Sequence, residues 1–422
     1  MEKKRYCIVG ASSRGLGMYA TPLSSDFRDV CDFVGVYDCN PGRSSDLSKA
    51  CGDIPVYNTF YEMIHEAKPD AVIVTTMDRF HEEYAVKAME YGCDAIIEKP
   101  MCITVDQVRS LLDAKERTGK NVTVTFNMRY MPYKLKVKEL LMSGVIGDIE
   151  HVTFEWNLIY GGHGTSYFRR WHAFLENSGG LMLTKAAHHF DLANWYIDSY
   201  PAKVSAFGKL DRYGENGTAK RVIGGDNPGT HCHSCPHAGT CELYHKLNSS
   251  EESLYAKNVK YDGYTPDACL FRKGMDIYDT TCVNVLYENG VTLSYSMNAN
   301  SPYEGWRIAF TGTKGRLEAG EILEGPADTV TATKDIIRIM KYDAAPEIIP
   351  VDTLNIAHGG GDQLLLKDLF ERPIEDDPFI QRATVIDGAA SVLIGALANE
   401  SIATGKTLDV TDRLGRELRS YK

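Results

Sequence analysis

The stretch Ala95-Ile96-Ile97-Glu98-Lys99-Pro100 predicts the architecture of the first part of this chain. Its short apolar run is typical of a strand buried in a parallel sheet. Pro100 ends the strand and favours an extended conformation for the preceding residue, Lys99. In an open α/β sheet, ligands bind at the carboxyl ends of the strands. A lysine at that edge is a candidate for proton transfer beside a bound ligand, although an exposed Glu–Lys pair would have the same sequence.

The composition is that of a globular protein with two domains. The chain has 422 residues, of which 43% are hydrophobic and 24% charged, and this length exceeds a single core. The net charge of -11 argues against nucleic acid or an anionic membrane as the main partner. We expect neither a signal peptide nor a membrane span. The eleven scattered cysteines are typical of reduced thiols, so we expect a cytoplasmic protein.

A glycine-containing turn follows the first predicted strand, Tyr6 to Val9. The turn Gly10-Ala11-Ser12-Ser13-Arg14-Gly15 has the spacing of the dinucleotide fingerprint, with serine at the second glycine position. Gly10 permits the tight turn, and Gly15 lets the next helix pack close to the strand. Ser12 is expected where the backbone approaches a pyrophosphate at the helix N-terminus. Because a glycine-poor turn also occurs in proteins that bind no dinucleotide, the neighbouring strands must decide.

A carboxylate at the end of the second predicted strand supports the dinucleotide interpretation. The strand Phe33 to Tyr37 is followed by Asp38, at the distance from the turn where an acidic side chain binds the adenosine ribose. A carboxylate there would repel the 2′-phosphate of NADP, so NAD is the expected cofactor. Arg43 follows closely in the sequence and leaves NADP open as the alternative.

Further strands alternate with predicted helices. Ala71 to Thr76 leads into a loop that ends at His81, and the strand Val122 to Phe126 ends in Asn127-Met128-Arg129. This alternation indicates a doubly wound parallel sheet, the Rossmann fold, which we place over residues 1–126.

Together these residues resemble the Gfo/Idh/MocA family, named after glucose–fructose oxidoreductase, inositol dehydrogenase and a rhizopine-catabolism protein. The most specific mark is Glu98-Lys99-Pro100, and the resemblance covers nearly the whole chain. It implies a nicotinamide cofactor and a sugar or polyol substrate. The cofactor contacts that it implies are Gly10, Ser12, Ser13, Arg14, Gly15, Asp38, Arg43, Thr75, Thr76, His81, Glu98, Lys99, Asn127 and Arg129.

From about Asp148 the sequence changes to alternating strands. Thr281 to Tyr287 and Val291 to Ser296 are joined by the hairpin turn Glu288-Asn289-Gly290. We therefore expect residues 127–422 to form an α+β domain with a large, mostly antiparallel open sheet. The family's second domain has such a sheet, and its open face commonly forms oligomers. An apolar open face would otherwise be exposed, so we expect a homodimer or homotetramer.

A second chemical segment is Thr184-Lys185-Ala186-Ala187-His188-His189-Phe190-Asp191. If this segment is helical, Thr184, His188 and Asp191 share one face. The family pattern has an acid, a histidine four residues later and an aspartate three after that. Thr184 stands in the place of the first acid, which leaves a proton relay through that position in doubt, and Lys185 is an alternative polar partner. The catalytic candidates are Lys99, His188 and Lys185.

The loop before this segment, Tyr160 to His172, is rich in aromatic and cationic side chains. Aromatic faces stack on sugar rings, and arginine donates hydrogen bonds to hydroxyl groups. We interpret the loop as a wall of the substrate site, and an ordinary surface loop is the alternative. The substrate candidates are Arg169, Trp171, His172, Thr184, His189 and Asp191.

Residues 224–270 form an insertion that lacks the pattern of a core. Cys232 and Cys235 have the spacing of a structural zinc site, and Cys241 and Cys269 would complete four thiolate ligands. A closed metal site could hold a polar insertion together where no apolar core is available. Free thiols and a disulfide are the alternatives.

The sequence thus predicts an NAD-dependent oxidoreductase that transfers hydride between nicotinamide and a secondary hydroxyl of a sugar, sugar derivative or inositol. Lys99 or His188 would take the hydroxyl proton, since burial beside the positively charged ring lowers the pKa of a lysine toward neutrality. Two other classes stay open. One is a glycoside-cleaving enzyme that oxidises C3 transiently, and the other is a non-catalytic sensor of NAD or sugar.

Overall fold

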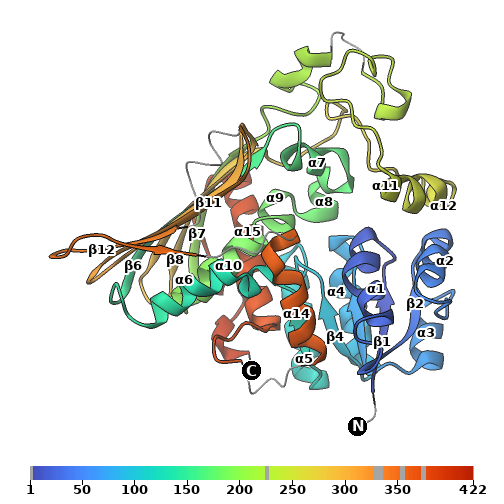
Figure 1. Ribbon diagram of the computed structural model, residues 1–422, viewed down its shortest axis with the longest axis horizontal. Coiled ribbons are helices and arrows are strands. Elements are labelled where there is room, and N and C mark those ends of the chain that lie inside the picture. Colours follow the sequence, from blue (N-terminus) through green and yellow to red (C-terminus); the bar gives the residue numbers. More distant parts are fainter. Residues whose placement is uncertain (1–2, 224–227, 327–335, 352–356, 372–376, 422) are drawn as a thin grey trace.

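The computed structural model describes residues 3–223, 228–326, 336–351, 357–371 and 377–421 (Figure 1). Two sheets organise these residues. Sheet A has six strands in the order β14-β5-β4-β3-β1-β2, and sheet B has nine in the order β13-β12-β11-β10-β6-β9-β8-β7-β15. Both predicted architectures, a Rossmann sheet and a large mostly antiparallel sheet, are confirmed.

Sheet A contains five parallel strands, because each of its central strands is apolar enough to be buried on both faces. Every residue of β3 is buried, as are Ala95, Ile96 and Ile97 of β4. The strands are β1 (Lys4–Val9), β2 (Cys31–Tyr37), β3 (Ala71–Val74), β4 (Asp94–Ile97), β5 (Val122–Val124) and the antiparallel β14 (Ala383–Thr384). The helices among them are α1 (Thr21–Ser24), α2 (Pro41–Ala50), α3 (Phe60–Ala67), α4 (His81–Glu90) and α5 (Val105–Thr118).

The end of the chain returns to sheet A. Strand β14 pairs with β5 through Ala383 opposite Val124. The helix α14 (Gly361–Phe370) packs Leu365 and Leu366 into the apolar cluster beneath β1 and β2. The first sheet is therefore completed by residues from the last sixty of the sequence, which strand patterns in residues 1–126 could not indicate.

Sheet B is antiparallel except for the pair β6 and β9. Its strands are β6 (Ile149–Ile159), β7 (Pro201–Lys209), β8 (Thr280–Tyr287), β9 (Thr292–Ser301), β10 (Glu304–Gly312), β11 (Gly315–Glu324), β12 (Ile336–Lys341), β13 (Glu347–Pro350) and β15 (Leu408–Asp409). The helices of this part are α6 (Pro132–Met142), α7 (His163–Arg169), α8 (Leu175–Ser178), α9 (Leu181–Thr184), α10 (Ala187–Ile197), α15 (Val385–Thr404) and α16 (Val410–Leu414).

One face of sheet B is covered and the other is open. Figure 1 shows α6, α10 and α15 along the side that faces sheet A. Burial alternates strictly along β8, which leaves every second side chain of this strand on the opposite face. Phe207 and Leu286 are 71% and 39% exposed there. The open sheet expected from the sequence is therefore present.

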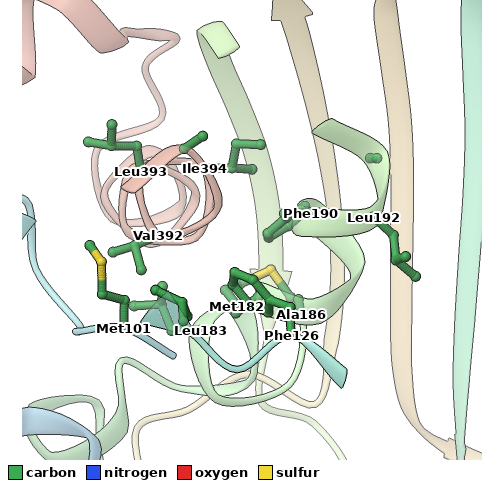
Figure 2. Packing of buried hydrophobic residues seen from close by; sticks show 14 of the residues in the cluster. Met101, Phe126, Met182, Leu183, Ala186, Phe190, Leu192, Val392, Leu393 and Ile394 are labelled. Carbon is green, nitrogen blue, oxygen red and sulfur yellow. The ribbon is translucent and has the colours of Figure 1, made fainter. Parts of the chain in front are cut away.

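The main core lies between the two sheets, around α15 (Figure 2). Met101 from the loop after β4, Leu183 from α9 and Val392 from α15 point into the same space. A Cβ atom at Gly388 would lie 2.7 Å from the Met101 sulfur, so glycine permits this close approach. By length and composition alone α15 could cross a membrane, but 67% of that window is buried inside the fold, as expected of a core helix.

Candidate active site

The glycine turn after β1 packs directly against the end of β3. Gly10 has a φ of +96°, and a Cβ there would lie 2.6 Å from the Thr75 carbonyl carbon. A Cβ at Gly15 would lie 2.6 Å from the Gly10 oxygen. The Ser12 hydroxyl accepts a hydrogen bond from the Gly15 N–H at 3.1 Å and donates to the Thr75 carbonyl at 3.0 Å. The two glycines thus have the steric roles that the sequence predicts for a dinucleotide turn.

A cavity of about 380 Å³ lies beside this turn, and Gly10, Asp38, Arg43, Thr75 and Thr76 are among its lining residues. Asp38 accepts a hydrogen bond from the Ala11 N–H at 2.6 Å, which ties the end of β2 to the turn. The Arg43 guanidinium lies 3.1 Å from a carboxylate oxygen of Asp38 and 2.5 Å from one of Asp262. Two carboxylates therefore bind Arg43, the residue that kept NADP as the alternative cofactor in the sequence analysis.

A second cavity of about 380 Å³ adjoins the first, since Ser12, Thr75 and Thr76 line both. The strand-end residues predicted for the cofactor and two of the loop residues predicted for the substrate meet here. The sequence-predicted residues that line it are Ser12, Ser13, Arg14, Thr75, Thr76, His81, Glu98, Lys99, Trp171, His172 and Thr184. The two cavities together form a continuous groove from Asp38 to Lys99.

A charged network supports one wall of the second cavity. Arg14 donates to Glu98 at 2.7 Å and makes two hydrogen bonds with Asp362, at 3.0 and 3.1 Å. Asn127 also donates to Asp362, at 2.6 Å. Burial acts to raise the pKa of Glu98, but the charges of Arg14 and Lys99 outweigh it and the pKa is lowered. Sequence reasoning missed Asp362, which follows a glycine run at the start of α14.

Lys99 presents its amine to this cavity from the end of β4. Its Nζ donates to the Thr184 carbonyl at 2.7 Å. Burial lowers the pKa of Lys99, while the charges of Asp78 and Glu98 act in the opposite direction. A partly buried amine held by a hydrogen bond is oriented, and its pKa is lower than that of a lysine in water. Lys99 therefore has the properties expected of a proton-transfer group.

Asp78 is a second group in this cavity that sequence reasoning missed. It is 5% exposed and lies where β3 gives way to the short helix η2 (Asp78–Phe80). Burial raises the pKa of its carboxyl to about 8. The available indication was its place after a buried strand, where site residues gather in α/β sheets.

The segment around His188 folds differently from the expected continuous helix. Helix α9 ends at Thr184 and α10 begins at Ala187, so Thr184 and His188 are not successive turns of one helix. The expectation that Thr184, His188 and Asp191 share one helical face is therefore wrong. His188 and Lys185 are both buried, and in the described part of the chain neither lines the cavity that contains Lys99. Burial lowers the pKa of Lys185 to about 8, and its amine lies 4.9 Å from the centre of the Trp156 ring.

A predicted cofactor residue and a predicted substrate residue bind each other. Arg129 makes two hydrogen bonds with Asp191, at 2.8 and 2.6 Å, and a third with Asp387 at 2.9 Å. Arg129 and Asp191 are each 1% exposed, and neither lines the two cavities described above. Their described contacts therefore link the loop after β5 to α10 and α15 inside the protein.

His189 is a core residue. Its Nδ1 lies 2.7 Å from the Tyr295 hydroxyl, and its ring stacks on Trp156 with 4.0 Å between the ring centres. His189 is buried among these aromatic side chains, and it lines neither of the two described cavities. Of the substrate candidates, Trp171, His172 and Thr184 are the ones that line the groove.

The cysteine insertion does not form the expected metal site. Cys232, Cys235, Cys241 and Cys269 line one small cavity, but all are free thiols. Over the described residues, which exclude 224–227, no group of three or more His, Cys, Asp or Glu side chains could hold a metal ion. The Arg169 guanidinium lies 3.3 Å from the Cys232 sulfur, and burial raises the pKa of Cys241 and Cys269. The described residues therefore give no support to a structural zinc site.

The same insertion lines the groove and contacts the glycine turn and helix α2 of the Rossmann domain. Figure 1 shows its helices α11 (Ser249–Leu254) and α12 (Val259–Asp262) next to α2. The Tyr255 hydroxyl accepts a hydrogen bond from the Ser13 N–H at 3.1 Å. Asn258 donates to Asp46 at 2.8 Å, and a Cβ at Gly42 would lie 2.1 Å from the Asn258 side-chain oxygen. Tyr255, Tyr264 and Asp262 therefore help line the cofactor groove, which the sequence did not indicate.

Comparison with known proteins agrees with this geometry. Residues 4–126 match the family model described as an oxidoreductase family with an NAD-binding Rossmann fold, and residues 138–410 match the model of its C-terminal α/β domain. The chain belongs to the Gfo/Idh/MocA family. It is therefore an oxidoreductase with an NAD-binding domain, as the resemblance implied.

Two relatives and one solved structure show how this Gfo/Idh/MocA protein compares with others. YteT of Bacillus subtilis (strain 168), named as an oxidoreductase, is 34% identical over 97% of this chain and 98% of its own. D-glucoside 3-dehydrogenase of Escherichia coli (strain K12) is 27% identical over 63% of this chain and 77% of its own. The structure of levoglucosan dehydrogenase with NADH and L-sorbose has a TM-score of 0.67 at 16% identity, covering 97% of this chain and 99% of that one.

Proposed function

We propose that this protein oxidises a secondary hydroxyl of a sugar, a sugar derivative or an inositol, with NAD as the hydride acceptor. The proposal depends on one observation, a partly buried lysine amine in the cavity that adjoins the dinucleotide turn. The substrate class is supported by the names of the relatives, which include a glucoside dehydrogenase and a levoglucosan dehydrogenase.

The residues along the groove fit NAD. Asp38 would bind the adenosine ribose, and the backbone at Ser12 and Ser13 would face the pyrophosphate at the start of the helix. Arg43 is held between Asp38 and Asp262, so it has little freedom to bind the 2′-phosphate of NADP. When bound, NAD supplies a ring carbon that accepts hydride. A nicotinamide ring at the end of this groove away from Asp38 would lie on the side of Lys99.

Lys99 then acts on the substrate hydroxyl. Burial lowers the pKa of its amine, and in its neutral form the amine can accept the hydroxyl proton as the carbon loses hydride. The hydrogen bond to the Thr184 carbonyl fixes the direction of the amine. Trp171 and His172 line the cavity and would contact the sugar ring. His188 and Lys185 remain candidates for the same proton.

A panel of substrates tests the proposal directly. Methyl β-D-glucoside, free D-glucose, myo-inositol and an aryl β-D-glucoside are each incubated with the full-length protein and NAD, and NADH is followed by absorbance. We expect NADH with at least one of them, and a preference for NAD over NADP. Among Lys99→Met, His188→Gln and Lys185→Met, the first should lose the most activity. If none of these polyols gives NADH or any other product, the proposed function is wrong.

The same panel separates the two alternative classes. Release of the aryl group without net NADH would identify redox-assisted glycoside cleavage, in which C3 is oxidised and later reduced again. Binding of NAD measured by calorimetry, with no turnover of any sugar, would identify a sensor. Net NADH on a free sugar or inositol supports the dehydrogenase.

We also propose that copies of the chain associate through the open face of sheet B. Phe207 and Leu286 are exposed on this face, and apolar groups of this size are commonly covered in a partner interface. Light scattering of the purified protein should give a dimer or tetramer, and Phe207→Asp should shift it toward the monomer.

A further inference from the structure

The insertion brings a carboxylate to the cofactor groove, close to the end of β2. Asp262, the last residue of α12, lines the same cavity as Asp38 and Arg43. One nitrogen of the Arg43 guanidinium lies 2.5 Å from Asp262, and another lies 3.1 Å from Asp38. The Arg43 side chain is only 11% exposed. The guanidinium is therefore held between one carboxylate of the Rossmann domain and one of the insertion.

A buried polar contact between the insertion and α2 sets the position of Asp262. Asn258 is buried, and its side chain donates to Asp46 at 2.8 Å and to the Leu254 carbonyl at 3.1 Å. Its own carbonyl accepts a hydrogen bond from the buried Asn40 side chain at 3.1 Å. Helix α12 begins at the next residue and lies beside α2 (Figure 1). The anchor at Asn258 therefore fixes where Asp262, four residues later, meets the groove.

Negative charge exceeds positive charge at this end of the groove. Among the described residues that line the cavity, Arg43 is the one cation, and Asp38, Glu83 and Asp262 are the carboxylates. Glu83 has a separate partner, Lys87, at 2.5 Å, so the other two carboxylates share Arg43. Burial acts to raise the pKa of Asp262, but its polar contacts, Arg43 among them, outweigh it and the pKa is lowered. Asp262 is therefore charged at neutral pH.

We propose that Asp262 sets the choice between NAD and NADP, acting on the cofactor through Arg43. This proposal rests on the proposed function. In dinucleotide-binding folds, the acid after the second strand binds the ribose of NAD, and a nearby arginine accommodates the 2′-phosphate of NADP. Arg43 follows that acid, but its guanidinium already donates to two carboxylates. A 2′-phosphate would have to displace Asp262 and would meet two negative charges, so Asp262 is a positioning residue that excludes NADP.

Calorimetry with NAD and with NADP on the full-length protein tests the proposal without a substrate. Asp262→Asn keeps the size of the side chain and leaves Arg43 paired with Asp38 alone. The Kd of NADP should fall about tenfold, because one edge of the guanidinium becomes free to bind a phosphate, while the Kd of NAD stays within about twofold. The matched control is Glu252→Gln, which removes a negative charge from an exposed position of the insertion and should leave both Kd values within about twofold.

A double variant tests whether Asp262 acts through Arg43. Arg43→Gln removes the guanidinium, so adding Asp262→Asn to it should change the Kd of NADP by less than about threefold. A merely structural role would give another result. If Asp262→Asn only loosened the insertion, both cofactors would bind more weakly, as we expect of Gly42→Ala. The gain in NADP affinity should also shrink in about 0.5 M salt, because charge interactions near the surface are screened there.

The outcomes separate this proposal from the proposed function. A Kd of NADP that stays within about twofold of wild type in Asp262→Asn would overturn the role of Asp262, and so would equal weakening of both cofactors. Neither result touches the proposed function if the substrate panel gives NADH. Binding of NAD without turnover of any sugar would count against the proposed function alone, and the two Kd values would still test Asp262. Failure of the wild-type protein to bind either cofactor would overturn both.

Discussion

Two clusters of buried charge lie close to the carboxyl edge of sheet A, and they differ in whether their charges satisfy each other. In the cluster of Arg129, Asp191 and Asp387, the arginine forms three hydrogen bonds with carboxylates and lines neither cavity. In the cluster of Lys99 and Asp78, the groups line a cavity, and one carboxyl oxygen has no partner among the described residues. Buried charged side chains that are paired with each other hold helices and strands together. Charged side chains that line a cavity and lack some hydrogen-bond partners are available to a substrate.

The largest effect on stability should come from removing the arginine of the cluster of Arg129, Asp191 and Asp387. Arg129→Met leaves the carboxylate of Asp191 buried without its counter-charge, so the free energy of unfolding should fall by about 3–5 kcal/mol. The pKa of Asp191 then rises further above its unfolded value, so the loss should be greater at pH 8 than at pH 5. Urea unfolding at the two pH values measures both. The control is Arg117→Met, which removes an exposed pair with Glu90 and should cost less than about 0.5 kcal/mol.

Removing the amine of the open cluster should affect turnover and leave folding largely intact. Lys99→Met keeps the length of the side chain and removes the proton acceptor, so kcat should fall about a hundredfold or more, or about 3 kcal/mol in activation free energy. The unfolding midpoint should change little, because among the described residues the amine has a single hydrogen bond to lose, to the Thr184 carbonyl. Normal turnover of Lys99→Met with NAD bound would show that Lys99 does not take the proton. The two clusters would then not differ in their role in catalysis.

The sequence predicted the cluster of Lys99 and Asp78 only in part, and the reasons are physical. The strand Ala95 to Ile97 and the turn at Gly10 are local patterns, so both the sheet and the groove followed from them. Lys99 was placed correctly at the strand end because a parallel sheet puts such residues at one edge. Asp78 was missed because the cavity that it lines is completed by residues such as Thr184, more than a hundred residues away.

Arg129, His189 and Asp191 show the opposite case. Their residue types are those of a site, and Asp191 matches the last position of the family pattern, yet their described partners are Asp387, Trp156 and other core groups. Spacing along a helix does not say which face meets a cavity and which meets another helix. The break at Lys185 and Ala186 also changed the register that the helical interpretation assumed.

A smaller effect should follow from disturbing the insertion where it covers the groove. Gly42→Ala puts a Cβ where the Asn258 side chain now lies, 2.1 Å away, although alanine suits the helix α2 better than glycine does. The insertion should separate from α2, and the Kd of NAD should rise about tenfold, or about 1.4 kcal/mol. Calorimetry with NAD measures this. Gly239→Ala in the same insertion has no neighbour within 4 Å and should leave the Kd unchanged.

The smallest effect is expected at the cysteines of the insertion, and it sharpens the comparison with the two charge clusters. A bound metal ion would make the cysteines of the insertion a third cluster of charged groups. Because no group of three or more His, Cys, Asp or Glu side chains among the described residues could hold a metal ion, we expect no metal there. Elemental analysis should find less than about 0.1 metal ion per chain, and a chelator should shift the unfolding temperature by less than about 1 °C. A stoichiometric metal, or a chelator that lowers the unfolding temperature by several degrees, would show that thiolates hold the insertion together after all.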